Sequence, residues 1–329
     1  MEFAGIDAHK ADVLVHVIND DVKVVAEERL ATTDAGFDRL AFLLKDAQCV
    51  MEAGSTCYPV YDALIERGIK PKVAHPLYLK SYSGLKKTDK VDARRMALML
   101  KAGIIPEAHI PSVEVREARE LVKQHASIVQ HRTMEICKAK ALLLRHRIKY
   151  PSNLFGKKAD WFELTEYPAG VKLLLSQAYK SVQFLSEQKK QVDRVIENRA
   201  KLNPDAVILH SIPGIGWYGA FLLAVYIDDA ERFGSCEQLV SYAGLAPTIH
   251  QSGKTLHMGR ISKLGRPEIR GLLGQCAWVA VGTKNRFRKK YLKVKRKRGT
   301  KKAIVAVARK MLVTAYYLLK KREQYKEDA

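Results

Sequence analysis

Residues 3–29 read FAGIDAHKADVLVHVINDDVKVVAEER and contain three apolar, β-branched runs of strand length. The runs are Phe3–Ala8, Asp12–Ile18 and Val22–Arg29, and the polar Asn19-Asp20-Asp21 between the last two predicts a tight turn. Three consecutive strands with short connections predict an antiparallel meander at the start of the fold.

The next segments alternate between helical and strand patterns. Helical spacing of apolar residues appears at 33–46 and 59–67, and short strand patterns appear at 49–52 and 71–74. A meander followed by alternating elements is typical of an α/β ribonuclease-H-like fold. In that wiring the first and fourth strands lie side by side, so Asp7 and Glu52 are expected to be neighbours.

Four acidic residues of this region predict a metal site. Asp7 lies within the first strand run and Glu52 ends the fourth, where carboxylates are rare unless something neutralises them. Asp89 and Asp92 share one face of a helix that Thr88 is expected to cap. Two Mg²⁺ ions with oxygen ligands would relieve the repulsion among these acids. The alternative for Asp89 and Asp92 is surface pairing with Lys86, Lys87, Arg94 and Arg95.

The rest of the chain predicts long basic helices and then a mainly helical domain. Helical patterns over 112–150 and 171–202 suggest a helical hairpin or a coiled coil, and Asn203-Pro204 marks the next boundary. A glycine-rich segment, 244–274, lies within the last part. The predicted domains are 1–111, 112–204 and 205–329.

The composition points to a polyanionic partner. The 329 residues carry a net charge of +22 with a pI near 9.7, which favours nucleic acid. No apolar run is long enough to span a bilayer, and Glu2 and Asp7 lie where a leader would be positive. The five cysteines are scattered without metal-ligand spacing, so a cytoplasmic protein with reduced thiols is expected.

Three segments of the last domain are candidates for nucleic-acid contact. In Ile212-Pro-Gly-Ile-Gly216, Gly214 and Gly216 could offer backbone N–H groups to a phosphate, although a plain interhelical turn explains them equally well. Around Ser252 the cations Lys254, Arg260, Lys263 and Arg266 could stabilise phosphate charge, and here an ordinary phosphate-binding loop is the simpler interpretation. The run 284–298 offers phosphate contacts from Arg286, Arg288, Lys289 and Lys290 and base stacking from Phe287 and Tyr291, or it is a solvated basic face.

In combination these segments resemble a known family. Seven segments occur in the order typical of DEDD-type transposases of insertion sequence family 110, the relatives of the Piv invertase. They are Gly5-Ile-Asp-Ala-His-Lys10, Met51-Glu-Ala53, Lys87-Thr-Asp-Lys-Val-Asp-Ala-Arg94, Ile212-Pro-Gly-Ile-Gly216, Tyr242-Ala-Gly-Leu245, Gln251-Ser-Gly253 and Gly259-Arg-Ile-Ser-Lys263. The resemblance is weakest over 150–204, and the family pattern has a smaller residue at the position of His9.

The resemblance implies a RuvC-like domain, a coiled coil and a C-terminal transposase domain. It implies that Asp7, Glu52, Asp89 and Asp92 bind Mg²⁺ and that a serine attacks a DNA phosphate and becomes joined to it. Ser252 matches the family's nucleophile, with Ser262 as the second choice. A structured noncoding RNA, the bridge RNA, is expected to pair with donor and target DNA, and a dimer or tetramer is expected to assemble the site. The alternatives are a RuvC-like resolvase that uses water and a non-catalytic nucleic-acid-binding protein.

Overall fold

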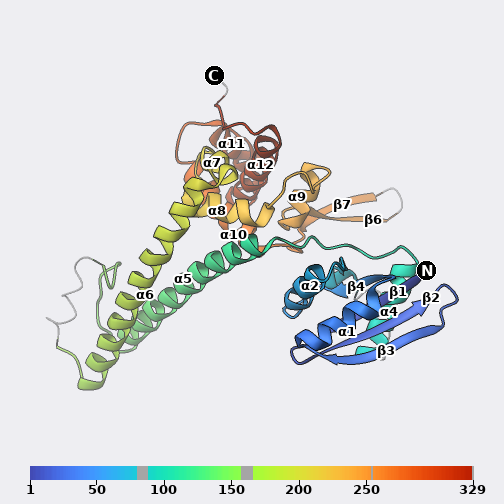
Figure 1. Ribbon diagram of the computed structural model, residues 1–329. Coiled ribbons are helices and arrows are strands. Elements are labelled where there is room, and N and C mark those ends of the chain that lie inside the picture. Colours follow the sequence, from blue (N-terminus) through green and yellow to red (C-terminus); the bar gives the residue numbers. More distant parts are fainter. Residues whose placement is uncertain (80–87, 157–165, 253–254, 328–329) are drawn as a thin grey trace. The chain divides into compact units, whose positions relative to one another are not determined.

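The chain folds into two compact units, Met1–Ile110 and Pro111–Ala329, seen in a computed structural model (Figure 1). The structure describes residues 1–79, 88–156, 166–252 and 255–327, and only the backbone at 77–78, 249–252 and 255–258. Each unit is described by itself below.

The first unit is built on a five-stranded sheet of order β3-β2-β1-β4-β5. β1 pairs antiparallel with β2 and parallel with β4, so the expected adjacency of the first and fourth strands is confirmed. The predicted turn between the second and third strands is also present, because the side chain of Asn19 accepts hydrogen bonds from the backbone N–H groups of Asp21 and Lys23. The strands are β1 (Glu2–Ala8), β2 (Asp12–Asn19), β3 (Val24–Ala31), β4 (Ala47–Glu52) and β5 (Lys72–Ala74).

Helices cover both faces of this sheet. Leu40 of α1 and Leu64 of α2 are buried against Ile6 and Met51 on one face. Met96 of α4 is buried with other apolar residues against the opposite face. This arrangement follows from the period of two along each strand, which turns successive side chains to opposite faces. The helices are α1 (Asp34–Leu44), α2 (Cys57–Glu66), α3 (Pro76–Leu79) and α4 (Asp89–Lys101).

Two long helices begin the second unit and pack against each other in opposite directions. Near one end of the pair Val122 of α5 (Val113–Arg145) shares a core with Ile196 of α6 (Ala169–Leu202). Near the other end Leu143 and Leu175 belong to a separate small cluster. The helical hairpin expected from the sequence is therefore present.

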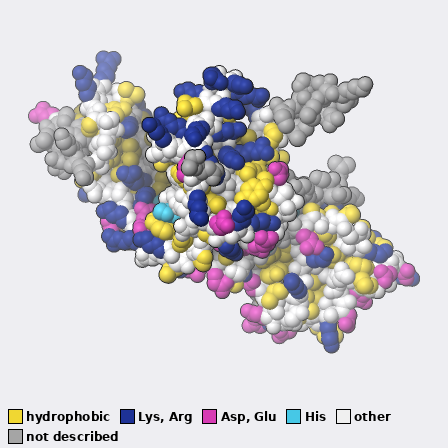
Figure 2. All heavy atoms as spheres, turned by 90° about the horizontal axis from the view of Figure 1, so that it is seen from above, with side chains coloured by type: hydrophobic (Ala, Val, Ile, Leu, Met, Phe, Trp, Pro, Cys, Tyr) yellow, Lys and Arg dark blue, Asp and Glu magenta, His cyan; other side chains and the backbone are white. Residues whose placement is uncertain are grey.

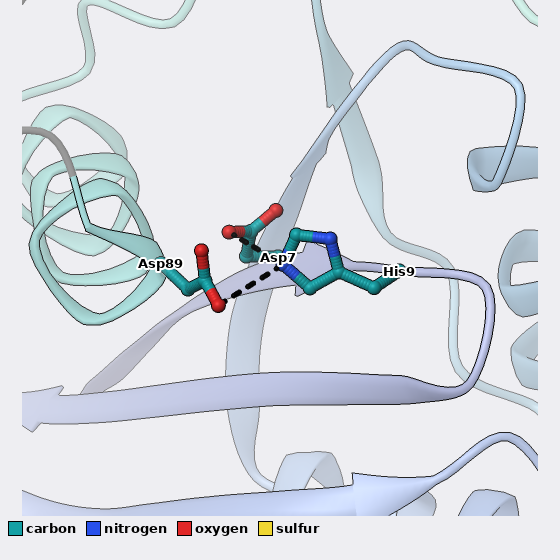
Figure 3. Close-up of side chains that lie close together, drawn as sticks. All are labelled: Asp7, His9 and Asp89. Atoms are coloured by element: carbon teal, nitrogen blue, oxygen red, sulfur yellow. Dashed lines mark ion pairs between the residues drawn. The ribbon is translucent and has the colours of Figure 1, made fainter.

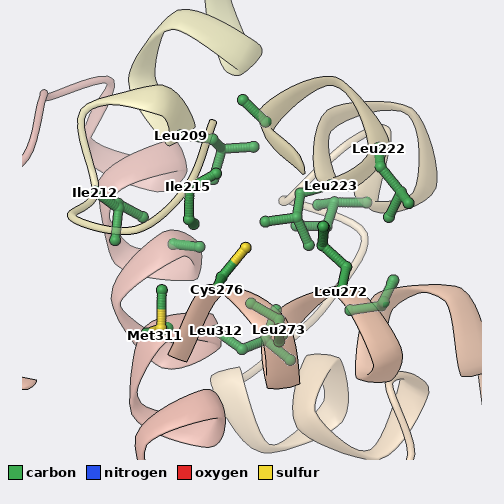
Figure 4. Close-up of a cluster of buried hydrophobic side chains, with 14 of the residues drawn as sticks. Leu209, Ile212, Ile215, Leu222, Leu223, Leu272, Leu273, Cys276, Met311 and Leu312 are labelled. Carbon is green, nitrogen blue, oxygen red and sulfur yellow. The ribbon is translucent and has the colours of Figure 1, made fainter. Parts of the chain in front are cut away.

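The remaining helices surround α8, whose side chains are nearly all buried (Figure 4). Side chains from α7, α10 and α12 meet those of α8 in one core, which also includes the ends of α5 and α6 described above. The helices are α7 (Pro204–His210), α8 (Trp217–Ile227), α9 (Cys236–Tyr242), α10 (Pro267–Ala280), α11 (Arg286–Arg298) and α12 (Thr300–Lys321).

A two-stranded sheet that the sequence does not predict interrupts these helices. β6 (Pro247–Ser252) pairs antiparallel with β7 (Thr255–Ile261) within the glycine-rich segment, where the sequence suggests a phosphate-binding loop. At Gly259 an added Cβ would lie 2.2 Å from the hydroxyl oxygen of Thr248, so the glycine that weakens the strand signal is needed for the pairing.

Candidate active site

The first strand turns Asp7 toward the face of the sheet that α4 covers. Ala4 and Ile6 belong to the core on the α1 and α2 side, whereas Phe3 belongs to the core on the α4 side. Because side chains alternate, Asp7 shares the face of Phe3. Glu52 shares that face with Val50 by the same argument, and it follows Met51, which pairs with Ile6 in the β1–β4 register. The two acids thus lie on neighbouring strands and on one face.

Gly5 lets α4 approach this face closely. A Cβ added at Gly5 would lie 1.8 Å from the carbonyl oxygen of Ala93 and 2.9 Å from the backbone nitrogen of Ala97. No side chain fits in that space, so the helix backbone rests directly on β1. The glycine two residues before Asp7 therefore determines how near the acids of α4 come to Asp7.

The first turn of α4 carries Asp89 and Asp92, as expected. Thr88 has an extended backbone, and its hydroxyl accepts a hydrogen bond from the backbone N–H of Val91 at 3.3 Å. This cap fixes the start of the helix. The positive end of the helix dipole also favours acids at these two positions.

Asp7, His9 and Asp89 form the centre of the site (Figure 3). Each offers one ligand atom, and the three atoms lie within 4.8 Å of one another. Nε2 of His9 lies 3.4 Å from Oδ2 of Asp7 and 3.3 Å from Oδ2 of Asp89. The sequence analysis noted His9 only as a departure from a family pattern and did not expect it in the site.

The electrostatic environment of Asp7 suits a cation. Burial raises the pKa of Asp7, the nearby His9 lowers it, and the charges of Asp89 and Asp92 raise it further, with a net upward shift. The pKa of Asp89 is lowered instead, chiefly by the hydrogen bond from Arg29, whose Nη2 lies 2.8 Å from Oδ2. A divalent cation would remove the repulsion that disfavours a charged Asp7.

Glu52 and Asp92 lie outside the 4.8 Å group of described residues. Glu52 is exposed at the end of β4, and Asp92 accepts a hydrogen bond from Nη1 of Arg95 at 2.7 Å. The proposed surface pairing of Asp92 with Arg95 is therefore present, although Asp92 also acts on the pKa of Asp7. The structure brings two of the four predicted acids into direct proximity and places the other two on the adjoining strand and turn.

The candidate nucleophiles lie in the second unit. Ser252 ends β6, where its backbone pairs with Thr255, and its side chain and Lys254 are outside the described atoms. Ser262 follows β7, and its backbone N–H donates to the carbonyl of Ala246 at 2.8 Å. Both serines therefore border the same small sheet.

The apolar side chains of the Ile212–Gly216 turn point into the core (Figure 4). Ile212 and Ile215 are buried, and a Cβ at Gly214 would lie 2.5 Å from the carbonyl oxygen of Cys276. Close packing against α10 thus explains the glycine at 214, as in the plain-turn alternative. Gly216 is exposed at the N-terminus of α8 and has open space around it, so its backbone remains accessible.

The candidate cations fall into two groups. Arg266 is exposed, but it donates to the hydroxyl of Tyr242 at 3.2 Å and lies over the Tyr226 and Tyr242 rings. Arg286 donates to Thr314 and lies over the Tyr325 ring. These two arginines therefore already contact side chains of their own unit. The other candidates that the structure describes, Arg260, Lys263, Arg288, Lys289 and Lys290, are exposed.

The aromatic residues of α11 are not available to bases. Phe287 is fully buried and Tyr291 nearly so, which contradicts the expected base stacking. The cause is amphipathic packing: these two residues occupy the core-facing side of α11, and the cations occupy the other. Trp278 of α10 is 52% exposed and lies edge-on to Tyr291, with 6.1 Å between the ring centroids. Figure 2 shows Lys and Arg side chains gathered in dense groups on the face that it presents.

A sheet with acids meeting from β1 and α4, followed by a mostly helical unit, has the form of a DEDD transposase, and residues 4–148 match the model of that class. Residues 206–292 match the model described as Transposase IS116/IS110/IS902 family. The chain therefore belongs to the IS110 family of insertion-sequence transposases.

Curated relatives agree with this assignment. The transposase for insertion sequence element IS1111A of Coxiella burnetii is 26% identical over 99% of this chain and 92% of its own length. The pilin gene-inverting protein of Moraxella lacunata is 29% identical over 78% of this chain and 74% of its own length. The transposase for insertion sequence element IS1328 of Yersinia enterocolitica is 24% identical over 84% of this chain and 82% of its own length. Among the described residues no helix combines the length and apolar character needed to cross a bilayer.

Proposed function

We propose that this transposase is an RNA-guided DNA recombinase that cuts and rejoins strands through a covalent serine–DNA intermediate. The observation that carries the proposal is the meeting of Asp7 and Asp89 from β1 and α4, with Asp92 close enough to act on the pKa of Asp7. Relatives named as transposases and as a pilin gene-inverting protein support a reaction on DNA segments.

Mg²⁺ fits the donor set of the first unit. We assign Asp7, Glu52, Asp89 and Asp92 as its ligands, since all four are carboxylates on one side of the sheet or on the helix turn above it. When bound, such ions supply positive charge to the oxygens of a reacting phosphate. Gly5 and the Thr88 cap hold the two aspartates of α4 in position for this role.

Ser252 is the proposed nucleophile, with Ser262 as the second choice. Its Oγ forms a bond to a phosphorus atom of the DNA backbone, and the bond from that phosphorus to a sugar oxygen breaks. The serine proton passes to solvent, and the released sugar oxygen takes up a proton. Attack by a sugar hydroxyl of another strand reverses the exchange and releases the serine, so no external energy source is required.

The proposed partners, nucleic acids and further copies of this chain, follow from two observations: the charge of each unit, and the location of the acids and the serines in different units. Residues 111–329 contain 42 basic and 19 acidic side chains, whereas residues 1–110 contain 15 and 16. We propose that the second unit binds the bridge RNA together with donor and target DNA. Because the acids and the serines belong to different units, we further propose that a dimer or tetramer combines them into complete sites.

The test compares three variants for protein–DNA adducts on a denaturing gel. Ser252→Ala is expected to abolish the adduct, the matched control Ser262→Ala to retain it, and Asp7→Ala to prevent cleavage. A strand cut without attached protein would favour the resolvase that uses water. If replacing the acids changes no activity, the alternative of a non-catalytic nucleic-acid-binding protein is favoured. Copurification of a discrete RNA with the full chain tests the guide: the absence of any such RNA counts against it.

A further inference from the structure

The unexpected member of the acidic site is His9, which lies between two carboxylates. Its backbone N–H donates to the carbonyl of Asp12 at 2.8 Å, which fixes the residue at the start of the β1–β2 connection. Its Nε2 lies within 3.4 Å of one oxygen from each of Asp7 and Asp89 (Figure 3). The imidazole therefore reaches the site from the connection that directly follows β1, the strand that carries Asp7.

The Nε2 atom has lost contact with water without gaining a well-formed hydrogen bond. It is inaccessible to solvent although the His9 side chain as a whole is 43% exposed. The two carboxylate oxygens are near, yet neither is aligned as a hydrogen-bond acceptor. In the tautomer that carries its proton on Nδ1, Nε2 has a buried lone pair without a partner, which is unfavourable, and coordination to a cation would satisfy it.

The spacing of the three atoms suits a common cation. Neighbouring ligand atoms of an octahedral divalent ion lie about 3 Å apart, close to the 3.3 and 3.4 Å between Nε2 and the two oxygens. Imidazole nitrogen is a softer ligand than carboxylate oxygen and shifts the preference of a site toward transition-metal ions.

We infer that Nε2 of His9 is a direct ligand of a divalent ion shared with Asp7 and Asp89, and that this position binds Mn²⁺ more tightly than Mg²⁺. The inference rests on the proposed metal site and adds a nitrogen ligand to it. A simple salt bridge is the alternative, in which a protonated His9 occupies the place of the cation and competes with it.

Pulsed electron paramagnetic resonance of the full-length protein with Mn²⁺ distinguishes these two roles. A directly bound histidine nitrogen modulates the Mn²⁺ echo at nitrogen frequencies, and this modulation is expected in the unmodified protein. It should vanish in His9→Ser and persist in His131→Ser, the same change at an exposed histidine of α5. His9→Asn provides a second variant in case the serine variant does not fold.

Affinity measurements by calorimetry give an independent readout. His9→Ser is expected to weaken Mn²⁺ binding by about tenfold or more and Mg²⁺ binding by less. If the variant binds Mn²⁺ more tightly, His9 is a competitor and the inference is wrong. Absence of nitrogen modulation in the unmodified protein also overturns it, whatever the variants do.

Asp7→Asn separates failure of this inference from failure of the proposed function. If Asp7→Asn weakens Mn²⁺ binding and His9→Ser does not, the acidic site stands and only the role of His9 is refuted. If neither change affects Mn²⁺ binding, both the inference and the proposed metal site are refuted.

Discussion

The two compact units of this transposase divide charge and chemistry between them. Residues 1–110 have nearly balanced charges, with 16 acidic and 15 basic side chains, and they contain the acids of the candidate active site. Residues 111–329 contain 42 basic and 19 acidic side chains, which accounts for all of the positive excess. Because a strongly positive surface would oppose a divalent ion, this difference predicts that the proposed binding of cations and of polyanions can be altered separately.

Removing one acid gives the largest expected effect and tests whether the functions are separate. Asp7→Ala should lower strand cleavage by about a thousandfold, because the site loses a metal ligand at its centre, while nucleic-acid affinity stays within a factor of two. Gel assays of cleavage and filter binding measure the two quantities. Asp21→Ala, at an exposed turn of the same unit, is the control. Equal losses of nucleic-acid binding and strand cleavage would show that the two units do not carry separate functions.

Gly5→Ala should destabilise the first unit by about 3 kcal/mol, since the new methyl group would overlap the backbone of α4. Divalent-ion affinity should fall as well, because Asp89 and Asp92 move with the helix. Thermal unfolding and ion titration are the measurements. Gly54→Ala has open space and should leave stability unchanged. If the Gly5→Ala protein is destabilised but binds the ion normally, ion binding does not depend on how closely α4 approaches β1.

Neutralising the exposed side of α11 tests the second unit. The double change Lys289→Ala and Lys290→Ala should weaken nucleic-acid binding by about tenfold near physiological salt and reduce the salt slope by about two, since two phosphate contacts are lost. Binding titrations at several salt concentrations give the slope. The control removes Lys45 and Lys70, two exposed cations of the first unit. An equal loss in the control would mean that binding reflects net charge alone.

The smallest effect concerns stability without metal. The raised pKa of Asp7 means that its charged form is disfavoured by folding, so this group lowers stability as pH rises from its unfolded-state pKa through its folded-state pKa. Asp7→Asn should therefore raise the melting temperature in chelator at neutral pH by about 3 °C. Below the unfolded-state pKa of aspartate the gain should disappear. A gain of the same size at every pH would show a cause other than charge.

Much of the first unit could be predicted because its signals are local. Apolar runs predicted the strands, and Thr88 followed by acids predicted the start of α4. The order of these elements then predicted the β1–β4 adjacency through the wiring of a ribonuclease-H-like fold. The position of His9 was missed because it depends on two carboxylates that α4 and β1 bring together from 82 residues apart. No short stretch of the sequence predicts that these three residues lie together.

In the second unit arginines and aromatic residues fit two interpretations in the sequence, nucleic-acid contact or contact within the folded unit. Arg266 and Arg286 look like phosphate ligands in the sequence, yet each lies over the ring of a tyrosine that is distant in the chain, Tyr242 and Tyr325 respectively. Phe287 and Tyr291 were assigned to base stacking because the cations around them hid the amphipathic period of α11. Contacts between segments that are distant in the chain decide each of these cases.

The direct contact between α4 and β1 at Gly5 would link the proposed metal site to folding. An ion bound by residues of both elements would act as a cross-link between helix and sheet, and its binding free energy would add to the stability of this unit. Calorimetry should then show one melting peak moving upward with ion concentration while another stays fixed. Mutations that weaken the packing of α4 on β1 should lower the affinity for the ion before they unfold the unit.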